Sequence, residues 1–405
     1  MGHDIVIADA RLVASTRRSM AVAGSEMSSG YQSKRPPASQ LRRLAMEALA
    51  LFWVTRLALL ALIAVWGPSR HKSILDLLTK ADGIWYRQIA LHGYAPPPPI
   101  GPTGVYLHTT DLAFFPLYPN LVRPVALFVD IRLAEVIVSL VAGSLAALLL
   151  AVWASRWVGQ RGALTVVCLW SLFPSAAVLS MGYTEGLFVA LALAVLLALE
   201  HDHWGYAALA CALAGLTRPS GLALLAAMGV AAALQRPFRW SRILATAIGS
   251  LGLLISLGHV ALVTHRWDGW FWLERTVWRS GFDGGRQTLT STWNALLQTR
   301  SIREPFVVSS VVVICFVAFL IWYLTTRPAW PPVVYVVLVA AMSLGGVNYF
   351  HCKPRFLLAA FPVLLPVGRR ISRLPKPVLA GGFVLALTLS TWWNAWLVVA
   401  WPASI

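Results

Sequence analysis

The sequence is poor in charged residues, and in acidic residues above all. Only 12 % of its 405 residues are charged, with 16 Asp and Glu against 33 Lys and Arg, whereas 58 % are hydrophobic. Soluble domains usually carry about 25 % charged residues, so a soluble globular protein is excluded. The net charge of +17 does not indicate a nucleic-acid partner, because the basic residues are scattered among short segments and form no continuous basic stripe.

The chain also lacks a disulfide framework and a secretory signal. Three of its four cysteines, Cys168, Cys211 and Cys315, fall inside apolar stretches, where we expect them to be packing residues. Residues 1–43 are polar and contain no apolar core of a signal peptide. We expect them to be a flexible cytoplasmic tail ahead of a single transmembrane domain over 44–405.

What the sequence has in abundance is long apolar runs, which recur from Leu44 to Ala400. A helix of about 20 apolar residues crosses a bilayer with its backbone hydrogen bonds satisfied internally. We therefore predict an all-α polytopic membrane protein with about 11 transmembrane helices. They are expected at roughly 44–67, 131–154, 162–181, 184–199, 204–217, 219–234, 243–264, 306–325, 332–347, 354–367 and 377–400.

Lys and Arg in the short loops orient these helices, because such residues are enriched on the cytoplasmic side. With the tail in the cytoplasm, two longer segments, about 68–130 and 265–305, lie outside and are expected to form interfacial helices. The composition, rich in Ala, Leu and Arg, favours the plasma membrane of a bacterium.

The first outer segment contains a candidate catalytic carboxylate. Leu78, Asp82, Trp85 and Ile89 share one helical stripe, which puts Asp82 on the apolar side of an interfacial helix. A carboxylate in a dehydrated site can serve as a general base. The alternative is that Asp82 caps a helix that begins at Gly83.

Farther along the same segment, Thr109-Thr110-Asp111 leads into an aromatic stretch that is broken by Pro116 and Pro119. This stretch cannot be an uninterrupted spanning helix and indicates a re-entrant or interfacial element. Asp111 is either a second acid or a helix cap.

Three further outer turns are polar. One holds Tyr183 and Glu185, and the next holds Arg218, so that Glu185 and Arg218 are either a structural ion pair or part of a site. The third contains His351, Lys353 and Arg355, spaced two apart, which suit a phosphate better than a single cation does. Contact with lipid headgroups is the alternative for these three.

The second outer segment combines aromatic and charged side chains around Trp270, over residues 267–275. Such a combination is typical of membrane anchoring, and equally of a sugar site in which rings stack on the sugar and charges hold its hydroxyls.

Several of these strings together resemble the PIG-V family, the second mannosyltransferase of GPI-anchor assembly with its bacterial relatives, in the GT-C superfamily of membrane glycosyltransferases. The matching strings are Asp82-Gly83 with Ile89-Ala90 and Gly93-Tyr94, then 113–119 (AFFPLYP), Phe173-Pro174-Ser175, 182–188 (GYTEGLF) and Arg218, with a weaker match around 353–362. The family usually has Trp before the acidic residue, where this chain has Ala81, and often Asn where it has Asp111.

The resemblance implies a GT-C-like fold and an inverting transfer of mannose from polyprenyl-phosphate mannose to a lipid-linked acceptor outside the cytoplasm, without a metal or cofactor. The acceptor class it suggests is a glycolipid such as a phosphatidylinositol mannoside, or a lipoglycan. Asp82 takes the position of the general base. We expect the departing phosphate at Arg218, His351, Lys353 and Arg355, with supporting or sugar-binding roles for Asp111, Glu185, Tyr183, Trp85 and Trp270.

Three other functions fit parts of the pattern. A transporter or lipid flippase would also place charges in the membrane, but it predicts polar residues through the full membrane depth, whereas these gather on one side. A non-catalytic membrane subunit would leave Asp82 dispensable. A sibling enzyme that uses another polyprenyl-phosphate sugar, such as arabinofuranose, is compatible with every residue named.

Overall fold

The computed structural model describes residues 38–101, 106, 108–297 and 303–405. Residues Leu44–Ile405 form one compact unit. Of the flexible tail predicted over 1–43, residues 1–37 lie outside the described residues, and residues 38–43 are helical.

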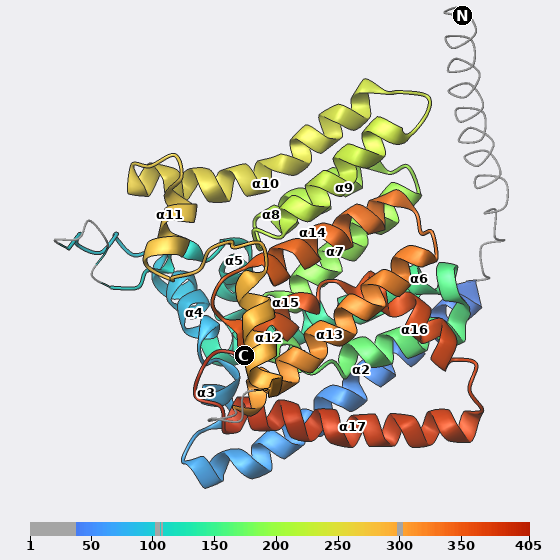
Figure 1. The fold of residues 1–405 in the computed structure, drawn as a ribbon. Coiled ribbons are helices and arrows are strands. Elements are labelled where there is room, and N and C mark those ends of the chain that lie inside the picture. Colours follow the sequence, from blue (N-terminus) through green and yellow to red (C-terminus); the bar gives the residue numbers. More distant parts are fainter. Residues whose placement is uncertain (1–37, 102–105, 107, 298–302) are drawn as a thin grey trace, which may run out of the picture. The chain divides into compact units, whose positions relative to one another are not determined.

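The described residues are almost entirely helical (Figure 1), and extended pairing among them is limited to two isolated bridges, Ile100 with Tyr106 and Phe282 with Gly346. The fold class predicted from the apolar runs is thereby confirmed. The helices are α2 (Ala38–Trp66), α3 (Ile74–Leu78), α4 (Asp82–His92), α5 (Leu117–Val125), α6 (Ile131–Ser171), α7 (Glu185–Glu200), α8 (Trp204–Gly215), α9 (Gly221–Leu234), α10 (Trp240–Thr264), α11 (Gly269–Thr276), α12 (Arg286–Leu297), α13 (Glu304–Thr325), α14 (Trp330–Gly345), α15 (Lys353–Leu357), α16 (Leu364–Ile371) and α17 (Lys376–Val399).

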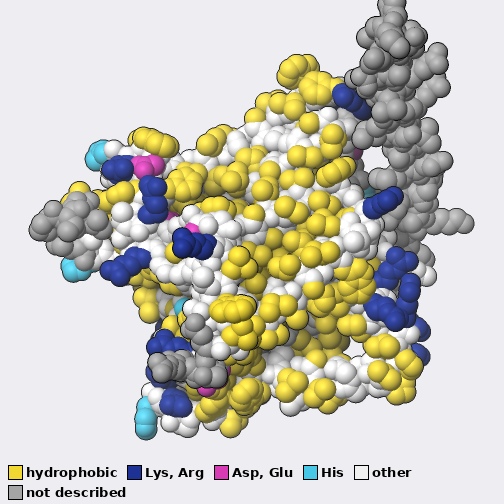
Figure 2. All heavy atoms as spheres, in the orientation of Figure 1, with side chains coloured by type: hydrophobic (Ala, Val, Ile, Leu, Met, Phe, Trp, Pro, Cys, Tyr) yellow, Lys and Arg dark blue, Asp and Glu magenta, His cyan; other side chains and the backbone are white. Residues whose placement is uncertain are grey.

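Five of the described helices, α2, α6, α10, α13 and α17, are long and apolar enough to cross a membrane. The bent pair Phe350–Leu357 and Phe361–Ile371, with 74° between its halves, makes a sixth if it counts as one span. Figure 2 shows apolar side chains over the middle of one face and Lys and Arg toward its edges, as a bilayer requires. The chain is a multi-pass membrane protein.

The expected number of eleven spans is not reproduced by helix length. The helices α8, α9 and α14 are apolar but have only 12, 14 and 16 residues, and spanning helices usually have about 17 to 25. The expected spans over α8 and α9 are each two residues longer than the helices, whereas the expected span 332–347 has the same length as α14 and is shifted by two residues.

The expected span 131–154 and the first ten residues of the expected span 162–181 lie in the single element α6 of 41 residues, whereas residues 172–181 follow it and include the 3₁₀ turn Ala176–Ser180. The break between them is one residue, Gly159, with φ 72° and ψ 172°. Only glycine adopts this conformation readily, so the chain changes direction there without a loop.

The helix α7 is the central element of the bundle and is buried over most of its length. It packs against α6 where two glycines meet, since a Cβ on Gly186 would lie 3.0 Å from the backbone nitrogen of Gly143. Small residues allow such close approach between membrane helices. This contact fixes the start of α7, which is the residue Glu185.

The short helices α3, α4, α5 and α11 lie together at one end of the long helices (Figure 1). We call this the Asp82 end. There α4 and α5 meet through the rings of Tyr86 and Tyr118, whose centroids are 5.0 Å apart. The polar residues singled out in the sequence gather at this end.

Candidate active site

Asp82 is the first residue of α4, and its side chain points to a distant part of the chain. Its Oδ2 accepts a hydrogen bond from Nη1 of Arg355 at 2.8 Å, and the carboxylate is 24 % exposed. The helix has no side-chain cap, because the residue at the capping position is Ala81. The carboxylate is therefore engaged with Arg355 and not with the start of its own helix.

The backbone just before Asp82 is in an unfavourable conformation. Ala81 has φ 54° and ψ −114°, a region that L-residues other than glycine rarely adopt. Backbone strain of this kind costs roughly 1–3 kcal/mol and is concentrated at functional sites. The surrounding packing therefore compensates for the strain at Ala81 and fixes the position of Asp82.

A second carboxylate, Glu185, lies behind Arg355 and joins it to Arg218. Oε1 of Glu185 is 3.2 Å from Nε of Arg355 and also accepts a hydrogen bond from Nη1 of Arg218. Arg218 further donates to Oγ1 of Thr184 at 3.4 Å. Asp82, Arg355, Glu185 and Arg218 thus form one connected group, which we call the ion cluster.

The ion cluster is largely closed off from solvent. The Glu185 side chain is only 4 % exposed, and its Oε2 has no hydrogen-bond partner within the described residues. The guanidinium of Arg355 lies over the rings of Tyr183 and Phe356, at 5.0 and 4.8 Å from their centroids. In such surroundings charge interactions are stronger than in water. A buried donor or acceptor without a hydrogen-bond partner lowers the stability of the fold unless a ligand binds to it.

The three basic side chains of the third polar turn do not share one partner. Arg355 belongs to the ion cluster. Nζ of Lys353 donates to the backbone oxygens of Ser343 and Gly346, both at 2.8 Å. The ring of His351 lies 5.6 Å from that of Trp401, and its Nε2 has no hydrogen-bond partner in the part of the chain that is described.

Two of the predicted site residues are the tryptophans Trp85, in α4, and Trp270, in α11. Trp85 stacks on Phe114 with ring centroids 5.9 Å apart and meets Trp278 edge-on at 5.5 Å. Trp270 of α11 donates from its Nε1 to the backbone oxygen of Ala113 at 3.3 Å. These contacts join the two predicted outer segments above the ion cluster.

Asp111 is buried in the first of these segments. Its Oδ2 accepts from the backbone nitrogen of Ala95 at 3.1 Å, whereas its Oδ1 has no hydrogen-bond partner among the residues described. Burial raises the pKa of this carboxyl above its usual range. The cap of the short helical turn Asp111–Ala113 is Thr110, whose Oγ1 accepts from the backbone nitrogen of Leu112, so Asp111 does not fill that role.

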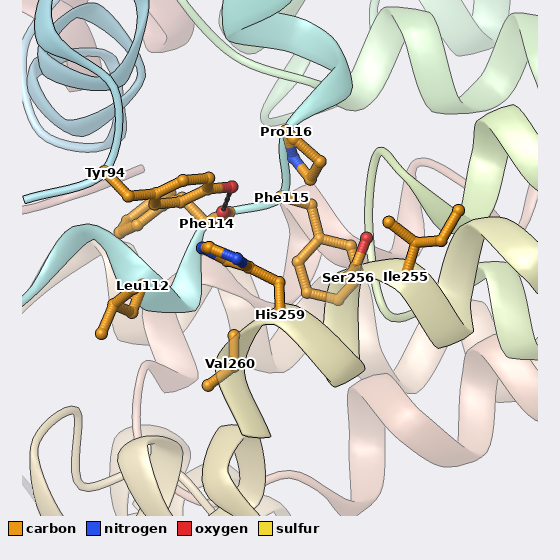
Figure 3. Close-up of a pocket in the computed structure, with 9 residues that line it drawn as sticks. All are labelled: Tyr94, Leu112, Phe114, Phe115, Pro116, Ile255, Ser256, His259 and Val260. Atoms are coloured by element: carbon orange, nitrogen blue, oxygen red, sulfur yellow. Dashed lines mark hydrogen bonds between the residues drawn. The ribbon is translucent and has the colours of Figure 1, made fainter. Parts of the chain in front are cut away.

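A cavity of about 220 Å³ lies beside this segment, between Tyr94 with residues 112–116 on one side and α10 on the other (Figure 3). Tyr94 closes one side, with its hydroxyl donating to the backbone oxygen of Phe114 at 2.7 Å and its ring 4.8 Å from that of His259. Because Phe114 also stacks on Trp85, the cavity adjoins the helix that carries Asp82. Its lining is mainly apolar: Tyr94, Leu112, Phe114, Phe115, Pro116, Ile255, Ser256, His259 and Val260.

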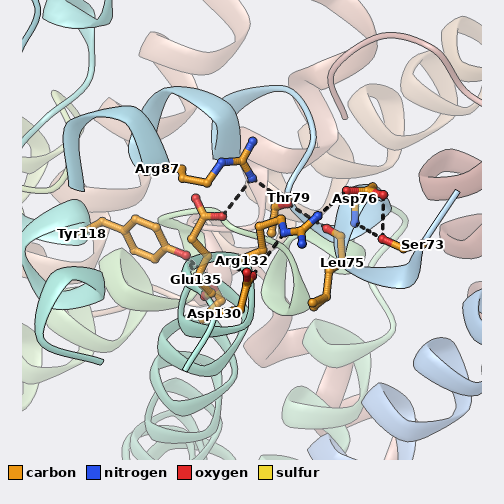
Figure 4. Close-up of polar contacts among 10 residues, drawn as sticks. Ser73, Leu75, Asp76, Thr79, Arg87, Tyr118, Asp130, Arg132 and Glu135 are labelled. Carbon is orange, nitrogen blue, oxygen red and sulfur yellow. Dashed lines mark hydrogen bonds and ion pairs between the residues drawn. The ribbon is translucent and has the colours of Figure 1, made fainter. Parts of the chain in front are cut away.

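A buried ion pair beneath α4 was not anticipated from the sequence. Oε2 of Glu135, at the start of α6, is 3.6 Å from Nη1 of Arg87, which also donates to Oγ1 of Thr79 at 3.0 Å (Figure 4). The Glu135 carboxylate packs against the backbones of Gly83 and Gly182, where an added Cβ would lie within 3.8 Å of it. It therefore supports the turns that precede Glu185 and follow Asp82.

Glu274 of α11 is a second carboxylate that the sequence analysis did not single out. Burial raises its pKa to about 7, and the charge of Asp82 adds to the effect. An acidic residue within an aromatic segment was the available signal, but membrane anchoring explained that segment equally well.

Comparisons with known proteins place the chain only loosely. No protein-family model matches it, and no curated protein sequence matches it. Among solved structures it is similar to ArnT from Cupriavidus metallidurans bound to undecaprenyl phosphate, with a TM-score of 0.49 and 15 % sequence identity. The similarity covers 83 % of this chain and spans 63 % of the ArnT chain.

Proposed function

We propose that the chain is an inverting membrane glycosyltransferase that moves mannose from polyprenyl-phosphate mannose to a lipid-linked acceptor on the extracytoplasmic face. The observation that carries the proposal is the pairing of Asp82 with Arg355 at 2.8 Å, with Glu185 behind the guanidinium. A base for the acceptor and a cation for the leaving phosphate then lie side by side.

In this transfer Asp82 takes the proton of an acceptor hydroxyl while the hydroxyl oxygen forms its bond to the anomeric carbon of the mannose. Oδ2 of Asp82 is held by Arg355, so we assign the proton to Oδ1. A positioned general base typically contributes about 10²- to 10⁴-fold in rate.

On the opposite face of the sugar, the bond between the anomeric carbon and the phosphate oxygen breaks, and its electron pair stays on the polyprenyl phosphate. Cations fixed in advance lower the barrier of such a step. Arg355 and Arg218 serve this phosphate, and Glu185, which contacts both, orients them. Arginine carries five N–H donors, of which the ion cluster uses only part.

The remaining predicted residues complete the proposed site. Two of the three N–H donors of Lys353 are used by backbone oxygens, which leaves one for the phosphate, and Nε2 of His351 is available to a ligand. Trp85, Tyr183, Trp270 and Asp111 are assigned to the sugar or to its support. The mannose, the polyprenyl carrier and acceptors such as a phosphatidylinositol mannoside or a lipoglycan come from the resemblance to the PIG-V family.

The test uses purified protein in lipid nanodiscs, supplied with radiolabelled polyprenyl-phosphate mannose and an extract of bacterial envelope lipids. The expected result is labelled mannose in a glycolipid, unchanged by EDTA because no metal takes part. Label transferred only from polyprenyl-phosphate arabinofuranose would assign the sibling reaction. Label that crosses a proteoliposome membrane without any covalent product would make the protein a transporter.

The proposed orientation is tested separately by single cysteines at two exposed positions, His92→Cys at the end of α4 and Arg369→Cys in α16. A membrane-impermeant maleimide added to intact cells is expected to label position 92 and not position 369. The reverse pattern would put the ion cluster on the cytoplasmic side and overturn the extracytoplasmic assignment.

A further inference from the structure

Lys80, two residues before Asp82, holds the end of a helix that contributes nothing to the ion cluster. Its Nζ donates to three backbone oxygens at the end of α17, those of Leu397 at 3.1 Å, Val398 at 2.9 Å and Trp401 at 2.7 Å. The last carbonyls of a helix have no partner within the helix, and a cation there also interacts favourably with the helix dipole. All three N–H donors of the ammonium group are used.

The same stretch of chain also holds the turn before Arg355. The hydroxyl of Ser404 is 3.4 Å from Sγ of Cys352, and the rings of Trp401 and His351 are 5.6 Å apart. The stretch is folded on itself, since Nε1 of Trp401 donates to the backbone oxygen of Ser404 at 3.2 Å. Residues 397–405 therefore contact the chain shortly before Asp82, at Lys80, and shortly before Arg355, at His351 and Cys352, and we call these nine residues the bracket.

Both contacts lie close along the chain to the residues of the Asp82–Arg355 pair. Lys80 is separated from Asp82 only by Ala81, whose positive φ is unfavourable and must be held by its surroundings. Cys352 stands three residues before Arg355, at the start of α15. The bracket thus fixes one point on each of the two segments whose side chains meet at 2.8 Å.

We propose that Lys80 is a positioning residue, which through the bracket holds the Asp82 carboxylate against Arg355. Because its donors are all used by backbone oxygens, Lys80 does not touch substrate. The catalytic part of this inference rests on the proposed glycosyl transfer, whereas the structural part, the placing of α4, is independent of it.

The experiment compares Lys80→Met, which keeps an unbranched side chain one atom shorter and loses its donors, with Lys80→Arg, which keeps the charge. Lys72→Met is the matched control, because Lys72 lies in the same segment and is exposed. Small misplacement of a catalytic group costs up to about 100-fold in rate. We expect Lys80→Met to lower kcat by about 10- to 100-fold with the KM for the donor unchanged within about twofold. Lys80→Arg should recover most of the loss, and Lys72→Met should match the wild type.

Hydrogen exchange followed by mass spectrometry gives a readout that does not need activity. In Lys80→Met we expect faster exchange over residues 81–92 and 353–357, with the other helices and the melting temperature in detergent unchanged. This result in a protein that transfers no sugar would uphold the positioning role and reject the proposed function instead.

Four results would overturn the proposal. They are wild-type kcat and exchange in Lys80→Met, a loss in Lys72→Met as large as in Lys80→Met, a loss in Lys80→Met that Lys80→Arg does not recover at all, and a uniform increase of exchange in every helix. If Lys80→Met does not fold, Lys80→Gln is measured in the same way. Failure of both variants to fold while Lys72→Met folds would make Lys80 a residue of general stability and would likewise reject the proposal.

Discussion

The two ends of α7 each carry a glutamate that pairs with an arginine. The two glutamates differ in whether both of their carboxylate oxygens have hydrogen-bond partners. Glu185 and Glu200 are the first and last residues of this 16-residue helix, so they are about 22 Å apart. At the Glu200 end, Oε1 accepts from Nε1 of Trp153 and Oε2 from Nη1 of Arg156, both at 2.9 Å. At the Glu185 end, one oxygen contacts two arginines and the other has no partner within the described chain.

The difference separates a structural ion pair from a candidate site. Glu200 is 23 % exposed and both of its carboxylate oxygens are hydrogen-bonded, so its environment gives no indication of a ligand. Glu185 is almost fully buried and is connected through Arg355 to Asp82, whose carboxylate reaches solvent. The open hydrogen-bonding capacity of the ion cluster, and not the presence of charge in the membrane, is what indicates chemistry there.

The largest expected effect is at Asp82 itself. Asp82→Asn keeps the shape of the side chain but removes the proposed base, so turnover should fall by at least about 100-fold. The measurement is transfer of radiolabelled mannose by folded protein, with folding checked by the melting temperature in detergent. Turnover like that of the wild type would show that Asp82 is not the base. It would also remove the functional difference between the Glu185 end and the Glu200 end of α7.

A matched pair of substitutions compares the two ends of α7 directly. Glu185→Gln removes the charge that orients Arg218 and Arg355, and we expect kcat to fall by about 10-fold, the equivalent of roughly 1.4 kcal/mol in the barrier. Glu200→Gln should leave kcat within about twofold of the wild type. Equal losses in the two variants would show that the ends do not differ in function.

A substitution at the Glu200 end of α7 should lower the stability of the protein and leave its activity unchanged. Arg156→Met leaves a partly buried carboxylate without its cation, and we expect it to lower the free energy of unfolding by about 1 kcal/mol. Thermal denaturation in detergent measures this loss, with kcat as the control. A drop in kcat without a drop in melting temperature would contradict the structural assignment.

The smallest effect concerns pH and Glu274. Because burial and Asp82 raise its pKa to about 7 in the folded protein, the folded state binds more protons than the unfolded state between the usual pKa of about 4.5 and 7. The free energy of unfolding should therefore fall as the pH rises through this range. Glu274→Gln lacks the titrating group, so its melting temperature relative to the wild type should increase from pH 5 to pH 8.

The same measurement connects Glu274 to the ion cluster. In an Asp82→Asn background the negative charge that contributes to the raised pKa is gone. The pH-dependent difference between Glu274→Gln and its parent should then be smaller. A pH-independent offset in both backgrounds would mean that Glu274 does not titrate in this range.

Much of the candidate site was predicted from the sequence, because polar residues in the turns between apolar runs are easy to recognise. Asp82, Glu185, Arg218 and Arg355 were all singled out in this way, and the structure joins them in one group. The alternative of a pure Glu185–Arg218 pair was incomplete, because Arg355 is a third member.

Other parts of the site could not be predicted for physical reasons. The regular spacing of His351, Lys353 and Arg355 predicted one phosphate cradle. Because this stretch is helical and residues two apart in a helix point about 200° away from each other, the spacing alone could not predict that Arg355 pairs with Asp82 while Lys353 donates to backbone oxygens. Lys80 could not be singled out from the sequence, since its partners are backbone oxygens more than 300 residues away. Glu135 stands at the start of an apolar helix with no motif around it.

The sequence by itself determined that this is a helical membrane protein and which turns are polar. Both follow from local properties, since hydropathy and helical backbone bonding act over about 20 neighbouring residues. Only the tertiary structure decided that Asp82 meets a cation 273 residues along the chain, that one glutamate of α7 is satisfied while the other is not, and that Lys80 holds α17. These depend on how the helices pack, and close packing is decided by side chains that are distant in the sequence and adjacent only in the fold.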